Sequence, residues 1–231
     1  MDRKLYDLAA ADPACRFSQH CWRVRLALYH KGLDYDAEPW RFTDKEAIAF
    51  AGTQKVPVLV DGERVIHDSW EILGYLQDTY AQGPSLFGGP DARAQVAFFR
   101  HWTERVVHAG LAPMIVRDIW ARLHERDQAY FRETREARFG RTLEALAEET
   151  PQRLPAFREA LAPLRATVEA QAFVAGDARA CPTSSSTRPC SGCAAARGSS
   201  CSSPMTPWRP GSRAWTRPSP APERAALRRR P

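Results

Sequence analysis

The sequence contains no apolar run long enough to cross a membrane. A bilayer-spanning helix needs about 18 or more apolar residues in succession, whereas the apolar runs here last only a few residues. The first eight residues, MDRKLYDL, are too charged for a secretory signal. With 231 residues, 44% of them apolar, the chain can form one large domain or two small ones with their own cores. We therefore expect a globular, cytoplasmic protein that does not bind membranes.

Cysteine is scarce, and its spacing does not suit a metal or redox site. Cys15 and Cys21 are the only cysteines in the first 178 residues, and they lack the Cys-x-x-Cys spacing of redox enzymes. The six histidines form no cluster with metal-ligand spacing. We expect no metal and no thiol redox catalysis, and we expect Cys21 to act as a small apolar residue on the inner side of a helix.

Excess positive charge is missing from most of the chain. Residues 1–178 carry 23 basic and 26 acidic residues, a net charge of −3, whereas residues 179–231 carry ten Arg and only Glu223. Leu227 is the only Leu, Ile, Val or Phe in that tail. Such a composition predicts disorder, because the tail cannot bury enough apolar area to offset its conformational entropy. Nucleic-acid binding would depend on the tail alone, so we expect no nucleic-acid partner.

A change of reading frame is a second explanation for the tail. If the codons of Ser184 to Ser186 are of the TCN type, a frame moved back by one base reads NTC, which encodes Phe, Leu, Ile or Val. The same shift turns the codons of Pro182 and Thr183 into NAC, which includes Asp. We interpret residues 179–231 as the product of a one-base slip near residue 178 that replaced the C-terminal helices. The alternative is a natural Arg/Ser/Pro-rich tail that binds anionic partners.

Periodicity and turn signals predict a β-α-β-α-β-β-α order in the first eighty residues. Gly32 ends the first helix, Thr43 to Glu46 form a capping box, and Asp61-Gly62 is a hairpin turn. The second strand must run parallel to the first if the helix between them crosses over right-handedly. The predicted strands are 5–8, 33–37, 56–60 and 64–67, and the predicted helices are 18–31, 43–50 and one that begins at 68–69.

The rest of the acidic part of the chain is predicted to be helical from Asp91 onward. Pro113 is expected to kink or break the first long helix. Leu86 and Phe87, in a Gly/Pro-rich linker, are expected to anchor one domain on the other. The expected apolar stripes comprise Val96, Phe99, Trp102, Val106 and Val107, continued by Ile115, Ile119 and Leu123, then Phe139, Leu143 and Leu146 on the next helix, and Phe157, Leu161 and Leu164 on a helix over 154–173 that includes Pro163.

Three segments of the first eighty residues together resemble a known family. Residues 17–25 (FSQHCWRVR), 55–59 (KVPVL) and 68–76 (DSWEILGYL) resemble the N-terminal domain of glutathione transferases, nearest to the serine-type branch that contains the zeta class and bacterial beta-etherases. The resemblance extends over residues 4–178. It implies an α/β thioredoxin-like N-terminal domain (1–82), a linker (83–90) and an all-α domain (91–178), followed by the aberrant tail (179–231).

The resemblance also assigns residues to a glutathione site, and their chemistry suits the assignment. Ser18 matches the family's catalytic serine, and at a helix N-terminus its hydroxyl would favour the thiolate of bound glutathione. A cis bond at Pro57 would expose the backbone of Val56 to an extended peptide. Asp68 and Ser69 begin a helix whose N–H groups suit the γ-glutamyl carboxylate. Ser18, Asp68 and Ser69 are equally suited to ordinary helix capping, and both roles can coexist.

The implied reaction is attack by the glutathione thiolate on a small apolar electrophile. The residues leave ether cleavage, isomerisation and general conjugation open, and a non-catalytic binding module of the same fold is the alternative. By the resemblance, Phe17, Trp102 and Val106 are candidates for the acceptor pocket, although each also suits a core. A homodimer is expected from the family alone. The family's turn before a central buried helix resembles residues 173–177, but the sequence after it lacks that helix.

Overall fold

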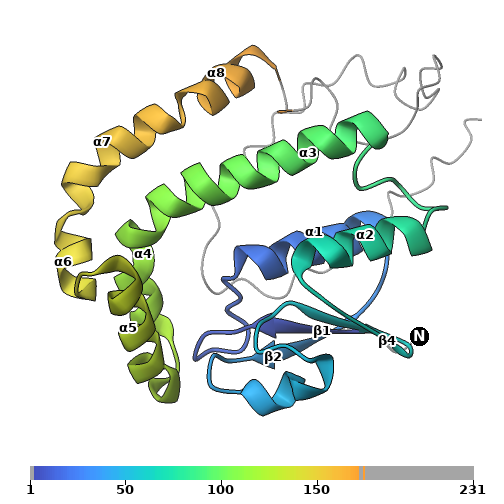
Figure 1. Ribbon diagram of the computed structural model, residues 1–231, viewed down its shortest axis with the longest axis horizontal. Helices are drawn as coiled ribbons and strands as arrows, with labels where there is room; N and C mark the ends of the chain where they lie inside the picture. Colours follow the sequence, from blue (N-terminus) through green and yellow to red (C-terminus); the bar gives the residue numbers. More distant parts are fainter. Residues whose placement is uncertain (1–2, 172–173, 175–231) are drawn as a thin grey trace, which may run out of the picture. The chain divides into compact units, whose positions relative to one another are not determined.

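The computed structural model describes residues 3–171 and 174 (Figure 1). The first part of the chain forms a four-stranded sheet with the order β2-β1-β3-β4. β1 pairs parallel with β2 and antiparallel with β3, and β3 pairs antiparallel with β4. This is a thioredoxin-like topology. Its elements are β1 (Arg3–Leu8), α1 (Gln19–Lys31), β2 (Asp36–Trp40), the 3-10 helix η1 (Lys45–Ala51), β3 (Val58–Asp61), β4 (Arg64–His67) and α2 (Ser69–Thr79).

The sheet has a core on each face. α1 and α2 lie side by side over one face, and η1 lies against the other (Figure 1). The first core is built on Leu5, Leu28 and Ile72, and the second contains Cys21 and Ile48. Side chains alternate between faces along a strand, so β1 supplies residues to both cores. The predicted first strand is therefore confirmed, and so is the position of Cys21 on the inner side of α1.

Both ends of α1 have the capping residues that the sequence predicts. Ser18 is the N-cap, and its Oγ accepts a hydrogen bond of 3.3 Å from the N–H of Cys21. Gly32 follows the helix with φ 68°, in the left-handed region that glycine adopts without steric cost. Leu33 N–H then bonds to the carbonyl of Leu28. These caps fix where α1 begins, and so fix the position of Ser18.

Two predictions for the first part of the chain are wrong in detail. The second strand is β2 at residues 36–40 and not 33–37, because Leu33 and Tyr35 pack against the first core instead of joining the sheet. The predicted capping box does not form either, since the hydroxyl and N–H of Thr43 both donate to the carboxylate of Asp127. The segment that follows is the 3-10 helix η1 with Asp44 as N-cap and no side-chain capping bond.

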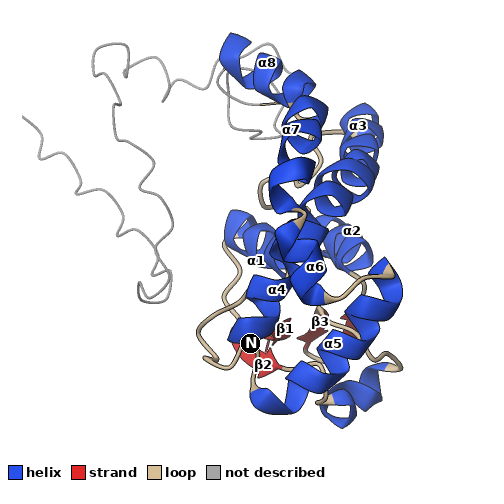
Figure 2. Ribbon diagram, turned by 90° about the vertical axis from the view of Figure 1, so that its left-hand side faces the viewer, coloured by secondary structure: helices blue, strands red, loops and turns tan. Residues whose placement is uncertain are grey.

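The second part of the chain is helical (Figure 2). None of the helices in the described residues is long and apolar enough to span a bilayer. The helices are α3 (Pro90–Trp102), the π-helix η2 (Thr103–His108), α4 (Ala109–Arg122), α5 (Glu125–Phe139), α6 (Leu143–Glu148), α7 (Thr150–Ala160) and α8 (Ala162–Ala170).

The helix boundaries near Pro113 and Gly140 differ from the predicted ones. Pro113 does not break the helix but lies buried inside α4. η2 ends immediately before Ala109, whose carbonyl would otherwise bond to the N–H that Pro113 lacks. Gly140, at φ 64°, separates Phe139 from Leu143 and Leu146, so the predicted single helix is two helices.

The predicted helix over 154–173 is also divided. Leu161 separates α7 from α8, and Pro163 lies in the first turn of α8, where a missing N–H is not required. The predicted tail, the frame slip and nearly all of the turn at 173–177 lie outside the described residues.

The helical part is well packed at one end only. Val116, Leu123, Phe131, Leu143 and Leu146 form a buried cluster on α4, α5 and α6. In contrast, η2, α7, α8 and the described side chains of α3 include no buried residue. Several predicted core residues of the apolar stripe are therefore partly exposed, and Phe98 and Phe99 are 66% and 43% exposed.

A buried carboxylate joins the sheet part to the helical part. Asp127 on α5 is fully buried, and its Oδ1 accepts bonds of 3.0 Å from Thr43 N–H and 2.7 Å from Thr43 Oγ1. The neighbouring pair Arg126 and Asp44 adds an ion pair of 2.6 Å. The N–H of Ala11 donates to the carbonyl of Arg122 at 2.9 Å. The bonds of Asp127 and Arg126 connect the segment before η1 to the start of α5, and the Ala11 bond connects the loop after β1 to the end of α4.

We expect the Asp127→Ala variant to lower the free energy of unfolding by about 2–3 kcal/mol, because two donors of Thr43 lose a charged acceptor. Denaturant unfolding measures the change. Asp118→Ala, which removes an exposed carboxylate on α4, is the control and should leave the free energy of unfolding unchanged. Equal loss in the two variants would contradict this role for Asp127.

Candidate functional site

Ser18 lies at the N-terminus of α1, where it was predicted. The residue is buried, with 8% of its surface exposed. Its Oγ accepts the N–H of Cys21, and its hydroxyl also lies within hydrogen-bond reach of the Cys21 thiol. Because a hydroxyl rotates, its hydrogen can be turned toward another acceptor. The free N–H groups and the dipole of the first turn favour negative charge at this position. The local environment therefore suits an anion such as a thiolate.

Cys21 itself is not suited to react. Burial, followed by the charge of Asp7, raises the pKa of the Cys21 thiol to about 12. The thiol is fully buried in the second core of the sheet. Because the thiolate is the reactive form of cysteine, this residue is inert at neutral pH.

The predicted cis bond is present between Val56 and Pro57. Pro57 is buried and lies directly before β3, where a residue without an N–H does not interrupt the sheet. Val56 is half-buried. The backbone N–H and C=O of Val56 are not used in β3, which begins at Val58, and they suit pairing with an extended peptide.

Asp68 and Ser69 begin α2. Asp68 has φ 66°, which is uncommon for a residue with a Cβ atom and often marks a functional position. Its Oδ1 accepts the N–H of Trp70 at 2.8 Å and, more weakly, that of Glu71 at 3.4 Å. Ser69 is buried, and its Oγ accepts a hydrogen bond of 3.0 Å from Nη1 of Arg23. The N-terminus of α2 thus carries an added guanidinium.

Arg23 connects this helix start to the helical part of the chain. Its Nη2 lies 3.5 Å from the carboxylate of Glu104 on η2, which also accepts a bond of 3.1 Å from Arg100. Burial alone would raise the pKa of Glu104, but the hydrogen bond from Arg100 and the charges of Arg100 and Arg23 outweigh it and lower that pKa. Glu104 is therefore a stable carboxylate that holds both guanidinium groups in place.

Two histidines lie beside this ion-pair network. The ring of His20, in the first turn of α1, faces the ring of His108, the last residue of η2, with centroids 6.1 Å apart and an edge-on angle of 78°. Burial, with the charges of Arg23 and His108, lowers the pKa of His20. Burial and Arg23 also lower the pKa of His108. Both imidazoles are thus neutral at neutral pH.

The three predicted acceptor residues are placed in two different surroundings. Phe17 packs against the second core of the sheet and the buried cluster of the helical part, with its ring 6.4 Å from that of Phe42. Trp102 ends α3 with its ring 6.5 Å from that of Phe99, and half-buried Val106 lies in η2. No ring contact or core cluster in the described residues joins Phe17 to the other two.

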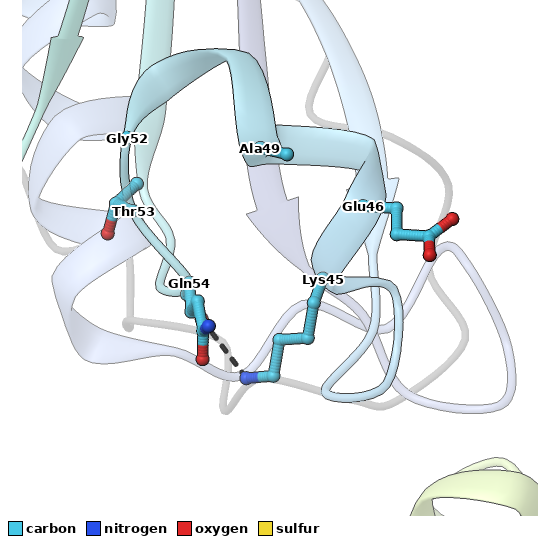
Figure 3. Close-up of a pocket in the computed structure, with 6 residues that line it drawn as sticks. All are labelled: Lys45, Glu46, Ala49, Gly52, Thr53 and Gln54. Carbon is cyan, nitrogen blue, oxygen red and sulfur yellow. Dashed lines mark hydrogen bonds between the residues drawn. The ribbon is translucent and has the colours of Figure 1, made fainter.

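A surface pocket lies on η1 and the segment that follows it (Figure 3). Lys45 spans it, with Nζ donating to the carbonyl of Gln54 at 3.1 Å. The same ammonium lies 5.2 Å from the ring centroids of Trp40 and Tyr130. The pocket is lined by Lys45, Glu46, Ala49, Gly52, Thr53 and Gln54, so it contains none of the predicted site residues.

Comparison with known families accounts for this arrangement. Residues 13–85 match the glutathione S-transferase N-terminal domain, and residues 94–181 match the glutathione S-transferase C-terminal domain. The chain belongs to the glutathione S-transferase family. The N-terminal match includes Ser18, the Val56-Pro57 bond and the start of α2, and the C-terminal match includes η2.

Individual glutathione S-transferases are similar over part of the chain. Glutathione S-transferase Z2 of Arabidopsis thaliana is 38% identical over 98 residues, which are 39% of this chain and 41% of that protein. A zeta-class enzyme of Euphorbia esula is 44% identical over 77 residues, 30% of this chain and 34% of that protein. The chain thus spans less than half the length of these relatives.

Solved glutathione transferases share the fold. GSTFuA3 of Phanerochaete chrysosporium is 28% identical with a TM-score of 0.66, over 74% of this chain and 73% of that one. A glutathione S-transferase of Ceriporiopsis subvermispora, solved in complex with glutathione, is 24% identical with a TM-score of 0.69, over 79% of this chain and 81% of that one.

Sequence reasoning missed Arg23, Glu104 and His108. Arg23 is not on the buried face of α1, and its contact with Ser69 depends on the packing of α1 beside α2. Glu104 and His108 share a face of η2, and a π-helix has no clear sequence signature. The one available signal was the spacing of four residues between this acid and histidine, which places them on one side of a helix.

Proposed function

We propose that this protein is a glutathione transferase in which Ser18 stabilises the glutathione thiolate for attack on a small apolar electrophile. The observation that carries the proposal is the buried hydroxyl of Ser18 at the N-terminus of α1, whose hydrogen can turn from the Cys21 thiol to a bound sulfur. A hydrogen bond and a helix N-terminus both stabilise a thiolate relative to a thiol. The bound thiol would therefore ionise at lower pH than in water.

The rest of the proposed site would hold the tripeptide. The backbone of Val56 before Pro57 would pair with the cysteinyl unit, and Asp68 would receive the α-amino group. Ser69, Arg23 and the N-terminus of α2 together present donors and positive charge that suit the γ-glutamyl carboxylate. Phe17, Trp102 and Val106 remain proposed for the acceptor side.

We place the protein in the serine-type branch, with the zeta-class and beta-etherase-like enzymes. The three motif segments at 17–25, 55–59 and 68–76 support this placement. Ether cleavage and isomerisation are both compatible with attack by a thiolate. A homodimer in the cytoplasm belongs to the same proposal, and sedimentation velocity measures the oligomeric state.

Glutathione titration followed by ultraviolet absorbance tests the proposal, because a thiolate absorbs where a thiol does not. We expect thiolate absorbance on binding at neutral pH, together with turnover of a conjugation substrate. Binding with neither thiolate nor turnover would favour the non-catalytic module instead.

We expect the Arg23→Ala variant to weaken glutathione binding by about tenfold while kcat changes little, because a charged hydrogen bond contributes about 1.5–3 kcal/mol and Arg23 lies at the carboxylate end of the site. Steady-state kinetics measures KM and kcat. Arg158→Ala, which removes an exposed guanidinium from α7, is the matched control. A fall in kcat with unchanged KM would exclude this role.

A further inference from the structure

His20 and His108 have no role in the function proposed above, yet they meet at the first turn of α1, the helix that Ser18 caps. His20 is the second residue of α1, two positions after Ser18, and both imidazoles are half-buried. Their edge-on contact joins the first turn of α1 to the end of η2. The pair thus lies where the N-terminus of α1 meets the helical part of the chain.

The charged groups around His20 come from three elements. The charges of Arg23 on α1, of Glu104 and His108 on η2, and of Asp68 at the start of α2 all act on it, and the His108 ring also contacts it. Asp68 belongs to the proposed γ-glutamyl site, and His20 is in the first turn of the helix that Ser18 caps at the proposed sulfur site. As a neutral imidazole it has one unprotonated ring nitrogen, which can accept a proton.

We propose that His20 receives the proton of the glutathione thiol when the thiolate forms at Ser18. This inference rests on the proposed function. The S–H bond breaks, its electron pair stays on sulfur, and the proton moves to the imidazole of His20. In the next step the S–C bond forms, the bond to the leaving group breaks with its electron pair, and the imidazolium returns its proton to that group. His20 is neutral again at the end.

Other titratable groups near Ser18 are less suited to accept this proton. Cys21 is buried and its thiol stays protonated at neutral pH. Glu104 is held by two guanidinium groups and is a weaker base than imidazole. Asp68 is occupied with capping α2. The ordinary pKa of an imidazole is closest to the operating pH, which favours proton transfer in both directions. Burial and Arg23 lower the pKa of His20 in the free protein, and the negative charge of the bound thiolate would oppose this and hold the proton on the imidazole.

Proton counting by calorimetry tests the inference in the full-length protein. Titration with glutathione in two buffers of different ionisation enthalpy gives the protons released to solvent, and thiolate absorbance is read on the same samples. We expect the protein to retain the thiol proton, whereas the His20→Gln variant releases about one proton per thiolate formed. We also expect kcat/KM of that variant to fall by about 100-fold at neutral pH. His67→Gln, an exposed histidine on β4, is the control.

The outcomes separate the two proposals. Absence of thiolate in the unaltered protein would overturn the function proposed for Ser18. Thiolate formation with equal proton release from the unaltered protein and His20→Gln would overturn the role of His20 alone. If His20→Gln fails to fold, NMR titration of the unaltered protein decides: glutathione should raise the pKa of His20, and S-methylglutathione, which has no thiol, should not. Equal shifts with both ligands would contradict the inference.

Discussion

The Ser18→Ala variant should retain glutathione binding but form little thiolate at neutral pH, and its kcat/KM should fall by about 100-fold. The reason is that the variant lacks the Ser18 hydroxyl, the positioned donor that would stabilise the glutathione thiolate. Glutathione is held mainly by the backbone of Val56 and the start of α2 in the proposed site, so its affinity should change less. Thiolate absorbance and steady-state kinetics measure the two effects.

Loss of the N-cap is the competing explanation, because Ser18 also accepts the N–H of Cys21. Removing a serine cap costs about 1 kcal/mol, whereas glycine in its place costs only a few tenths. Ser18→Gly should therefore fold normally and still lack thiolate, and Ser18→Thr should restore it. Thr142 is an equivalent N-cap, because its Oγ1 accepts the N–H of Ala145 on α6. Thr142→Ala should therefore lower the free energy of unfolding without changing the thiolate absorbance. Thiolate at the normal level in Ser18→Gly would refute the role of the hydroxyl.

Elements with local signals were predicted correctly. The caps at Ser18 and Gly32 fix α1, and Asp61-Gly62 fixes the hairpin of β3 and β4. β2 was misplaced by three residues because its limits follow from pairing with β1, and its sequence, DAEPW, has no alternation of its own. The positions of Ser18 and Asp68 as helix N-caps and of Pro57 before a strand were predicted for the same local reason.

The missed residues depend on contacts between distant segments. Thr43 is a good N-cap by sequence, but Asp127 takes both of its donors, and only the packing of α5 on the sheet part brings Asp127 there. Arg23 likewise reaches Ser69 and Glu104 through the packing of α1, α2 and η2. Helix and strand periodicity describes one element at a time, so it cannot predict contacts between side chains on different elements.

The second large effect concerns the C-terminal tail. We propose that residues 179–231 replace helices of the family fold. If the slip near residue 178 is undone, the same gene encodes a different C-terminus. We call that protein the frame-restored chain. The match to the C-terminal domain ends at residue 181. We expect the frame-restored chain to be soluble with a cooperative melt, and the 231-residue chain to be insoluble or partly unfolded.

The exposed end of the helical part supplies the physical reason. Phe98, Phe99 and Val168 are 66%, 43% and 47% exposed, and η2, α7 and α8 bury no residue. Burying such a side chain stabilises a fold by about 1.5–3 kcal/mol, and several of them together approach the total stability of a domain, about 5–15 kcal/mol. Leu227 is the only Leu, Ile, Val or Phe in the tail, whereas the restored frame turns Ser184 to Ser186 into apolar residues if their codons are of the TCN type.

Thermal melting, solubility and retention on glutathione-agarose of the two chains measure the effect, and independent sequencing of the gene tests its cause. A third chain that ends at residue 178 separates loss of the helices from harm done by the tail itself. If the missing helices matter, this shortened chain should be as unstable as the 231-residue chain. A cooperative melt of the 231-residue chain with glutathione retention, together with an intact reading frame in the gene, would contradict the slip and favour a natural Arg/Ser/Pro-rich tail.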